Sequence, residues 1–310
     1  MLTIILSNST SELGIVIGPY KSDDAALVEQ FYHETHELDA SIPNVSAAEW
    51  KHFVERSFNR GGIDFRVALS DSKCIGVLAS SVRDNEQFGL LRHFRITVHP
   101  SFRRQKIGTS LIDIVFAQDS IASLTYQSNL MRDWNAGKIF LSKYGFLPGH
   151  EELFMELRSN PNLESSPVDG IRTRSFLATD LEACASLHNN GYRGKAGFVE
   201  ASTETFTQEA TAEGFQMWVA TSDERIIGFC NTYHASDNTG VVNSLVVNAG
   251  FSGRGIGRGL LTTALAGLHK DGRTRIELNV DSNNVSAIGL YYKVGFEVSD
   301  SMTSFNFTKR

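Results

Sequence analysis

The chain repeats itself, and this repeat constrains the fold more than any other feature. Residues 94–112 (FRITVHPSFRRQKIGTSLI) align with residues 243–261 (NSLVVNAGFSGRGIGRGLL), so that Gly108 meets Gly257. Two further pairs of segments keep nearly the same register: 64–81 with 216–233, and 134–146 with 283–296. A match that recurs three times along the chain predicts a duplicated structural unit.

The length of the chain agrees with two copies of such a unit. A chain of 310 residues is long for one core and suits two domains. The segment SNPNLESSPVDG is rich in Pro, Ser, Asn and Gly and offers little to bury, which is typical of a linker. We therefore expect domains at residues 1–158 and 171–310, joined by a linker at 159–170.

Each half shows the same order of expected elements. A helix precedes several consecutive strands, and a strand–helix–strand–helix–strand series follows. In the second half, residues 218–234 read as a hairpin that turns at Ser222 to Glu224, and 286–294 as a helix ended by Gly295. This order predicts an α/β fold, with a mixed sheet flanked by helices in each domain.

Composition excludes several classes of protein. The formal net charge of −6 comes with no basic block, which argues against a nucleic-acid partner. The 3 cysteines lack the spacing of metal ligands, so we expect reduced core residues and no metal. The N-terminus does not read as a signal peptide, and no window reads as a membrane span, so we expect a cytoplasmic protein without a membrane partner.

A glycine-rich turn in the second half suggests a binding site for phosphate. The strand-like VVNSLVV (241–247) leads into FSGRGIGRGLL (251–261), which enters a helix. Such a turn aims backbone N–H groups and the positive end of the helix at one point, and glycines let an anion approach. Neither a nucleotide P-loop nor a dinucleotide G-x-G-x-x-G fits these residues. The expected cradle residues are Ser252, Gly253, Arg254, Gly255, Ile256, Gly257 and Arg258.

A second motif narrows the class of ligand that the glycine-rich turn is expected to bind. Downstream, the chain reads NNVSAIGLYYKVGF (283–296). Together the two segments resemble the GNAT superfamily of acyl-coenzyme-A-dependent N-acetyltransferases, whose patterns are [Q/R]-x-x-G-x-[G/A] and N-x-x-A-x-x-L-Y-x-x-x-G-F. The chain departs from them once, with Ser252 where Gln or Arg is usual. The matching residues are Gly255, Gly257, Asn284, Ala287, Leu290, Tyr291, Gly295 and Phe296.

The resemblance implies a fold and a ligand. In this family two central strands splay apart, and the pantetheine arm of acetyl-CoA pairs with the strand before the glycine-rich turn. On this chain that strand segment is Leu245, Val246 and Val247. The resemblance also places Asn284, Ala287 and Tyr291 at the bound acetyl-CoA.

The resemblance assigns one catalytic residue and leaves the base open. Tyr291 matches the phenol that serves many relatives as general acid. Many relatives carry a glutamate on the strand before the turn, but VVNSLVV has no carboxylate. Asn243 or Ser244 holding a water, and His234 or Glu277 on a neighbouring strand, are the alternatives, as is deprotonation assisted by the substrate.

The first half reads as a degenerate copy. Lys106 takes the place of a cradle glycine, while Leu141 and Trp134 replace the motif tyrosine and asparagine. Arg103, Arg104 and Lys106 leave phosphate binding there as a minority hypothesis.

We therefore expect acetyl transfer to a primary amine of a small molecule, in the second domain. A non-catalytic acyl-CoA-binding or regulatory module and a protein N-acetyltransferase are the alternatives. The two-domain layout is similar to that of the mycothiol synthases. Residues 185–203 are expected to line the acceptor cleft. The acceptor, the acyl-chain length and the oligomeric state stay open.

Overall fold

The computed structural model divides the chain into two compact units. It describes residues 4–6, 14–40, 42, 45–47, 63–85, 88–117, 124–158, 163, 167–195, 198, 200–211, 214–235 and 238–308. Unit 1 comprises Met1–Gly149 together with Thr303–Arg310, and unit 2 comprises His150–Met302. Each unit is a mixed sheet flanked by helices, which confirms the predicted α/β fold.

The sheet of unit 1 contains strands from both ends of the chain. Neighbouring strands are antiparallel from β1 to β5, and β5 and β6 are parallel. The end of β13 lies next to β6. The strands are β1 (Ile4–Leu6), β2 (Ile15–Pro19), β3 (Ile63–Ser70), β4 (Lys73–Asn85), β5 (Gly89–Val98), β6 (Thr125–Met131) and the last residues of β13 (Phe296–Thr308).

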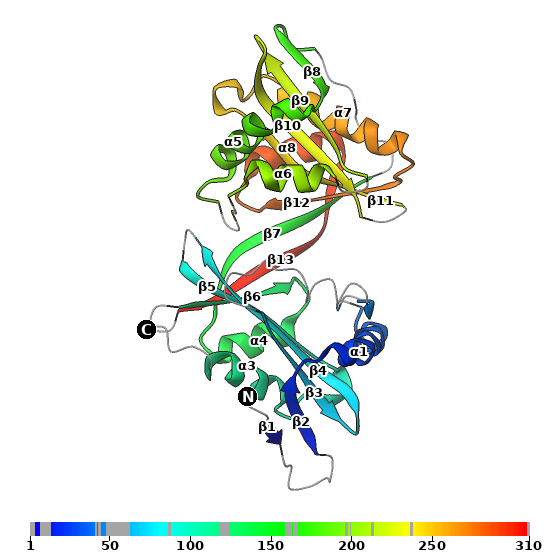
Figure 1. Ribbon diagram of the computed structural model, residues 1–310, viewed down its shortest axis with the longest axis vertical. Coiled ribbons are helices and arrows are strands. Elements are labelled where there is room, and N and C mark those ends of the chain that lie inside the picture. Colours follow the sequence, from blue (N-terminus) through cyan, green and yellow to red (C-terminus); the bar gives the residue numbers. More distant parts are fainter. Residues whose placement is uncertain are drawn as a thin grey trace. The chain divides into compact units, whose positions relative to one another are not determined.

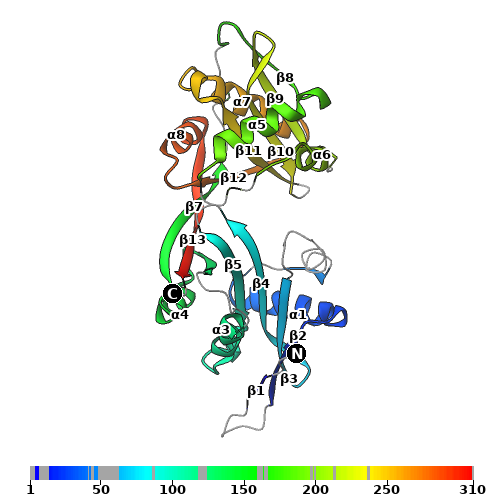
Figure 2. The same cartoon turned by 60° about the vertical axis from the view of Figure 1, so that its left-hand side comes forward.

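Helices cover both faces of that sheet, because side chains alternate along its strands. Val67 packs in a cluster with Phe31, whereas the next residue, Ala68, packs in a cluster with Leu111. Figure 2 shows α1 and α3 on opposite sides of β4 and β5. The helices are α1 (Ala25–Leu38), α3 (Ile107–Ala117) and α4 (Asn135–Lys143), with short 3-10 turns η1 (Ser22–Asp24) and η2 (Pro100–Phe102).

The sheet of unit 2 has the order β13-β7-β12-β11-β10-β9-β8. The strands are β7 (Leu147–Leu157), β8 (Ile171–Ser175), β9 (Gln216–Ser222), β10 (Arg225–His234), β11 (Thr239–Val247) and β12 (Arg275–Asp281). β9 and β10 form the predicted hairpin, and Asp223 and Glu224 turn it with φ of 46° and 62°. Only β11 and β12 are parallel among the pairs recorded in this unit.

Two apolar clusters hold the helices of unit 2 on its sheet. Phe229 belongs to a cluster with Leu187 and Phe206, and its neighbour Cys230 to a cluster with Leu260 on the other face. All 3 cysteines are free and buried. The helices are α5 (Leu181–Tyr192), α6 (Thr203–Ala210), α7 (Ile256–Lys270) and α8 (Val285–Val294), with 3-10 turns η3 (Ala178–Asp180) and η4 (Ala249–Phe251).

The two units differ from the predicted domain bounds because each takes a strand segment from the other half of the chain. In unit 2, β7 pairs with β12 so that Glu152 lies opposite Asp281. β7 also lies beside β13 (Figure 1), where Ser299 Oγ donates to the Phe154 carbonyl at 3.2 Å. In unit 1, Gln127 Nε2 donates to Asn306 Oδ1 at 2.9 Å. Of the predicted linker, the structure describes only residues 163 and 167–170.

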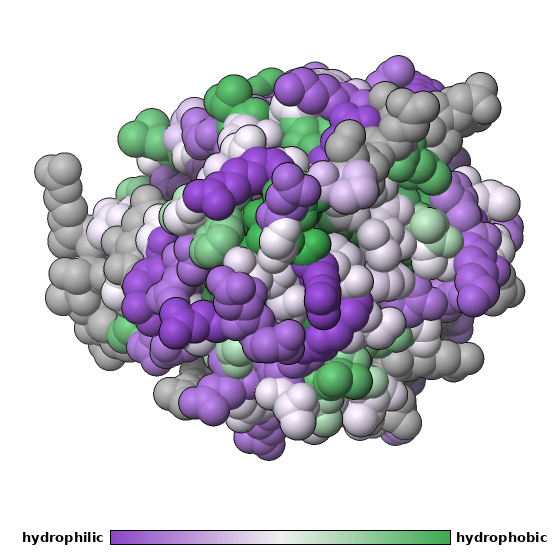
Figure 3. Space-filling model, turned by 90° about the horizontal axis from the view of Figure 1, so that it is seen from above, coloured by the Kyte–Doolittle hydropathy of each residue, from purple (hydrophilic) through white to green (hydrophobic). Residues whose placement is uncertain are grey.

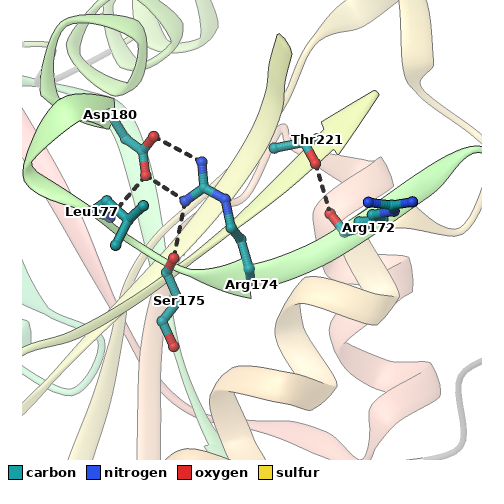
Figure 4. A network of polar contacts seen from close by, with 6 residues as sticks. All are labelled: Arg172, Arg174, Ser175, Leu177, Asp180 and Thr221. Carbon is teal, nitrogen blue, oxygen red and sulfur yellow. Dashed lines mark hydrogen bonds and ion pairs between the residues drawn. The ribbon is translucent and has the colours of Figure 1, made fainter. Parts of the chain in front are cut away.

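An ion pair between the partly exposed Arg174 and the buried Asp180 fixes the start of α5. Arg174 Nη1 and Nη2 donate to Asp180 Oδ2 and Oδ1 at 2.6 and 2.9 Å (Figure 4). The backbone N–H of Leu177 donates to the same carboxylate at 2.8 Å. The pair therefore ties β8 to the turn η3, and α5 begins directly after it.

Hydrophilic and hydrophobic side chains are interspersed on the face seen in Figure 3. Among the residues that the structure describes, no helix is long and apolar enough to cross a membrane.

Candidate active site

The two parallel strands of unit 2 separate part of the way along their length. β11 pairs with β12 from Thr239 to Val242, opposite Arg275 to Leu278. Beyond these pairs, β11 continues to Val247 and β12 to Asp281. A cleft of about 1060 Å³ lies at this splay, at the upper end of the range for small-molecule sites. Its lining residues all belong to unit 2.

The glycine-rich turn forms one end of the cleft. After β11, the Asn248 side chain accepts the Gly250 N–H at 3.0 Å, which shapes the 3-10 turn η4. Gly253 and Gly255 then adopt φ of 77° and 86°, which L side chains rarely adopt. Gly259 N donates to Gly255 O at 3.0 Å, the first hydrogen bond of α7. The backbone therefore turns from strand to helix within a few residues, as expected for an anion cradle.

The space around these glycines fits an approaching anion. A Cβ at Gly253 would meet nothing within 4 Å, and one at Gly255 would meet only Val168 Cγ2, at 3.9 Å. A Cβ at Gly257 would contact Leu290 and Val247, so this third glycine serves the packing of α7. Open space beside backbone N–H groups at a helix N-terminus is what a phosphate group needs.

The structure brings nearly all of the predicted binding residues together. The predicted residues that line the cleft are Leu245, Val246, Val247, Ser252, Gly253, Gly255, Ile256, Gly257, Arg258, Asn284, Ala287 and Tyr291. Arg254 is the exception. Its guanidinium lies over the Phe251 ring, 5.1 Å from the centroid, and Nη2 donates to Gly250 O at 3.4 Å. The exposed Arg254 side chain thus folds back on η4, away from the cleft.

The residues of the second motif build the start and the end of α8. Asn284 is the N-cap, and its side chain accepts the Ala287 N–H at 3.3 Å. Gly295 ends the helix with φ of 113°, which confirms the predicted left-handed cap. The caps therefore set where α8 begins and ends, and Leu290 and Tyr291 line the cleft.

Tyr291 is buried, with 7% of its surface exposed. Its ring meets Phe296 edge-on, with centroids 5.8 Å apart. Burial raises the pKa of the phenol above its ordinary value, and the neighbouring Tyr192 and Cys230 raise it further. The phenol is therefore protonated at neutral pH and able to donate. Tyr292, with 52% exposed, faces solvent.

A second phenol, which the sequence did not single out, lines the cleft. Tyr192 ends α5 and lies within the segment expected to line the acceptor cleft. It hydrogen-bonds to the Ser244 side chain and the Leu245 backbone, at the splay. Burial raises its pKa, although these hydrogen bonds oppose the shift. Of the same segment, residues 196, 197 and 199 lie outside the described residues.

Two of the four proposed bases are committed elsewhere. His234 Nε2 pairs with Asp271 Oδ2 at 3.1 Å, and Glu277 pairs with Arg275 at 2.6 Å. Neither His234 nor Glu277 lines the cleft, whereas Asn243 and Ser244 do.

Titratable residues that sequence reasoning missed also line the cleft, among them Tyr233, Lys293 and a group of three at the ends of β7 and β12. His150 and Glu152 come from β7, and Asp281 ends β12. His150 Nδ1 lies 3.6 Å from Asp281 Oδ2. Burial raises the pKa of Glu152, and the nearby Asp281 adds to the shift while His150 opposes it. No pattern in the sequence indicated that β7 joins the second sheet.

The equivalent turn of unit 1 has the same left-handed backbone positions but carries side chains at both of them. Arg104 and Lys106 hold φ of 68° and 64°, where unit 2 has Gly253 and Gly255. Arg103 Nε donates to the Val98 carbonyl at 3.3 Å, and Nη2 pairs with Asp39 at 2.9 Å. The Arg103 side chain therefore satisfies the Val98 carbonyl at the end of β5.

Comparison with known proteins agrees with this geometry. The model of the acetyltransferase (GNAT) family matches residues 181–296, and that of an acetyltransferase (GNAT) domain matches residues 61–148. The mycothiol acetyltransferase of Renibacterium salmoninarum is 25% identical over 226 residues, which cover 68% of this chain and 66% of that protein.

Solved structures share the fold along nearly the whole chain. A GCN5-related N-acetyltransferase from Sphaerobacter thermophilus aligns with a TM-score of 0.75 and 20% identity, covering 95% of each chain. A tandem GNAT protein from the clavulanic acid biosynthesis pathway aligns with a TM-score of 0.71 and 14% identity, covering 95% of this chain and 98% of that one. The chain belongs to the GNAT family of acetyltransferases and is an N-acetyltransferase with two such domains in tandem.

Proposed function

We propose that this enzyme transfers the acetyl group of acetyl-CoA to a primary amine of a small molecule, in the cleft of unit 2. The observation that carries the proposal is the meeting of three features in one cleft: the strand splay, the open glycine turn and the buried phenol of Tyr291. No metal is needed for direct transfer between a thioester and an amine. Among the described residues, none form a group of three or more metal-ligand side chains.

The residues around the cleft have the chemistry to hold acetyl-CoA. Acetyl-CoA supplies the acetyl group as an activated thioester. The N–H groups at the start of α7 face the diphosphate, and Arg258 adds positive charge on the same wall. At Leu245–Val247 the edge of β11 beyond its pairs with β12 offers backbone groups to the amides of an extended arm, next to the hydrogen bond between Tyr192 and the Leu245 backbone.

Tyr291 supplies the proton for the departing thiolate. Its raised pKa keeps the hydroxyl protonated across the neutral range. The same burial also makes a thiolate more basic, so the transfer from phenol to sulfur stays feasible. The role of Tyr291 is therefore that of a general acid at the splay.

Unit 2 is the better candidate for the active unit. In unit 1, side chains at Arg104 and Lys106 stand where backbone should approach a phosphate. The Arg103 side chain also occupies the Val98 carbonyl. Leu141, buried with 3% exposed, takes the position of the acid.

The acceptor is a small amine that carries a positive charge before reaction. Glu152 and Asp281 line the cleft and favour an ammonium group. Relatives named mycothiol acetyltransferase support a small-molecule acceptor.

Release of free thiol from acetyl-CoA tests the proposal. The assay would use a panel of amine acceptors. The panel would contain amino sugars, aminoglycosides, polyamines and amino acids, together with peptides that carry a free N-terminus or a lysine. We expect turnover with a small amine. If calorimetry shows firm binding of acetyl-CoA but no amine is acetylated, the protein is a non-catalytic binding module. If only peptides are acetylated, the enzyme is a protein acetyltransferase.

A further inference from the structure

We infer that Glu152, which the first half of the chain supplies to unit 2, accepts the proton of the acceptor's ammonium group. The inference rests on the proposed function and gives the cleft the base that β11 lacks. It also assigns a catalytic task to the strand β7, which sequence alone places in the other domain.

The register of β7 directs Glu152 into the cleft. Glu152 lies opposite Asp281, and Phe154 lies opposite Asn279. Because side chains alternate along a strand, these four residues share one face of the sheet. Met155 and Leu153 point to the other face, into the core beneath α7 and α8. Glu152, Asn279 and Asp281 all line the cleft at the splay.

Glu152 is available for a ligand, unlike the other carboxylates near it. Asp281 Oδ1 accepts the Asn283 N–H at 2.7 Å, and Asp281 Oδ2 faces His150. Glu156, on the same strand, pairs with Arg275 at 3.3 Å. Among the described residues, the structure records no hydrogen bond or ion pair for the half-buried Glu152 carboxylate. A half-buried carboxylate without a partner is costly unless a ligand satisfies it.

Its electrostatic setting suits a proton acceptor. Burial is the first cause of the raised pKa of Glu152. The charged groups that act on it are His150 on its own strand and Asp281 on β12, and their effects oppose each other. A carboxylate with a raised pKa is a stronger base than an exposed one.

The proton balance of the reaction closes with the two residues. The ammonium gives one proton to the Glu152 carboxylate and becomes a neutral amine. The nitrogen then forms its bond to the acetyl carbon while the carbon–sulfur bond breaks, and Tyr291 gives a proton to the sulfur. The acetylated nitrogen loses its extra proton to water, as does Glu152, and the Tyr291 phenolate takes one proton back from water, so that each turnover releases one proton.

The test compares Glu152→Gln with Glu156→Gln in the full-length enzyme. Both carboxylates lie on β7 and on the same face, but only Glu152 lines the cleft. With the best amine of the panel, we expect Glu152→Gln to lower kcat/KM for the amine about 100-fold at pH 7. The loss should shrink as pH approaches the pKa of the amine, because solvent then deprotonates it. Glu156→Gln should stay within about twofold of the wild type, and Glu152→Asp should recover part of the rate.

A full rate in Glu152→Gln, or a loss that is equal at every pH, would overturn the inference. So would an equal loss of acetyl-CoA affinity by calorimetry, because the substitution would then act on the fold. Absence of turnover in the wild type would instead reject the proposed function. In that case carbon-13 NMR of glutamate carboxyl groups decides. A Glu152 signal that titrates above the ordinary glutamate value of about 4.3 and shifts on adding ethylammonium supports the inference, and one that does neither rejects it.

Discussion

Tyr192 lies close enough to Tyr291 for its charge to raise the pKa of the Tyr291 phenol beyond what burial does. The two phenols reach the cleft from different elements, one at the end of α5 and the other within α8. Ionising both together is therefore unfavourable, and Tyr291 stays protonated while the enzyme works.

Replacing Tyr291 by Phe removes the proposed acid and leaves the ring. We expect kcat to fall about 100-fold, with the dissociation constant of acetyl-CoA unchanged. Stopped-flow thiol release and calorimetry measure the two quantities. The control is Tyr292→Phe on the exposed side of the same helix, which should keep the full rate. An unchanged kcat in Tyr291→Phe removes this residue from the mechanism.

The pH profile carries the signature of the raised pKa of Tyr291. An acid must be protonated to act, so its activity is lost as pH rises through its pKa. Because burial and Tyr192 both raise that pKa, the alkaline limb of kcat should lie above the ordinary phenol value of about 10. Tyr192→Phe should move the limb to lower pH. A limb below pH 10 in the wild type would contradict this assignment.

The positive φ angles of the turn predict a contrast between glycines. Gly255→Ala places a Cβ at φ of 86°, in the space that the diphosphate needs, and should weaken acetyl-CoA binding at least tenfold, about 1.4 kcal/mol. Gly259→Ala lies inside α7 with nothing within 4 Å, and should stabilise the helix by about 0.5–1 kcal/mol. Calorimetric binding and urea unfolding would reveal the contrast, and equal affinities in the two variants would refute the cradle.

Unit 1 should bind no acetyl-CoA, so calorimetry should give one site per chain. Its strained positions give a second expectation. Lys106→Gly and Arg104→Gly each relieve a left-handed residue and should raise the free energy of unfolding by about 1 kcal/mol. A stoichiometry of two in the wild type would show that the Lys106 side chain does not block the turn.

The ion pair of Arg174 and Asp180 makes a prediction about stability. Asp180 is 5% exposed, and its hydrogen bonds to Arg174 lower its pKa. A lowered pKa stabilises the fold above the unfolded value of about 4, and this contribution is lost as pH falls through the folded pKa. Asp180→Asn should therefore cost on the order of 2 kcal/mol at pH 7 and progressively less below pH 4. Urea unfolding at both pH values measures it, and a difference that is constant with pH would contradict the account.

Local chemistry made much of the fold predictable. The hairpin at Asp223 and Glu224, the cap at Gly295 and the turn at Gly255 each depend on residues near in sequence, and each was expected. The same holds for the cleft lining, since the turn and α8 fix most of it.

Contacts between distant segments escaped prediction. Residues 152–158 (ELFMELR) read as a strand, but a strand pattern does not identify the strand with which it pairs. The position of Glu152 in the cleft was therefore not predicted. Arg254 was expected at the cleft but is not among its lining residues, because its guanidinium lies over the nearby ring of Phe251. His234, a candidate base, instead pairs with Asp271 at the C-terminal end of α7.

Each unit depends on strand residues from the other half of the chain, which ties the two halves together. A fragment that starts at Ile171 would lack the residues of β7 that pair with β12, and its sheet would expose an unsatisfied edge. A fragment that ends at Arg158 would likewise lack the partner of Gln127. Neither half of the chain carries a complete sheet by itself, so the two halves have to be retained together whatever each of them binds.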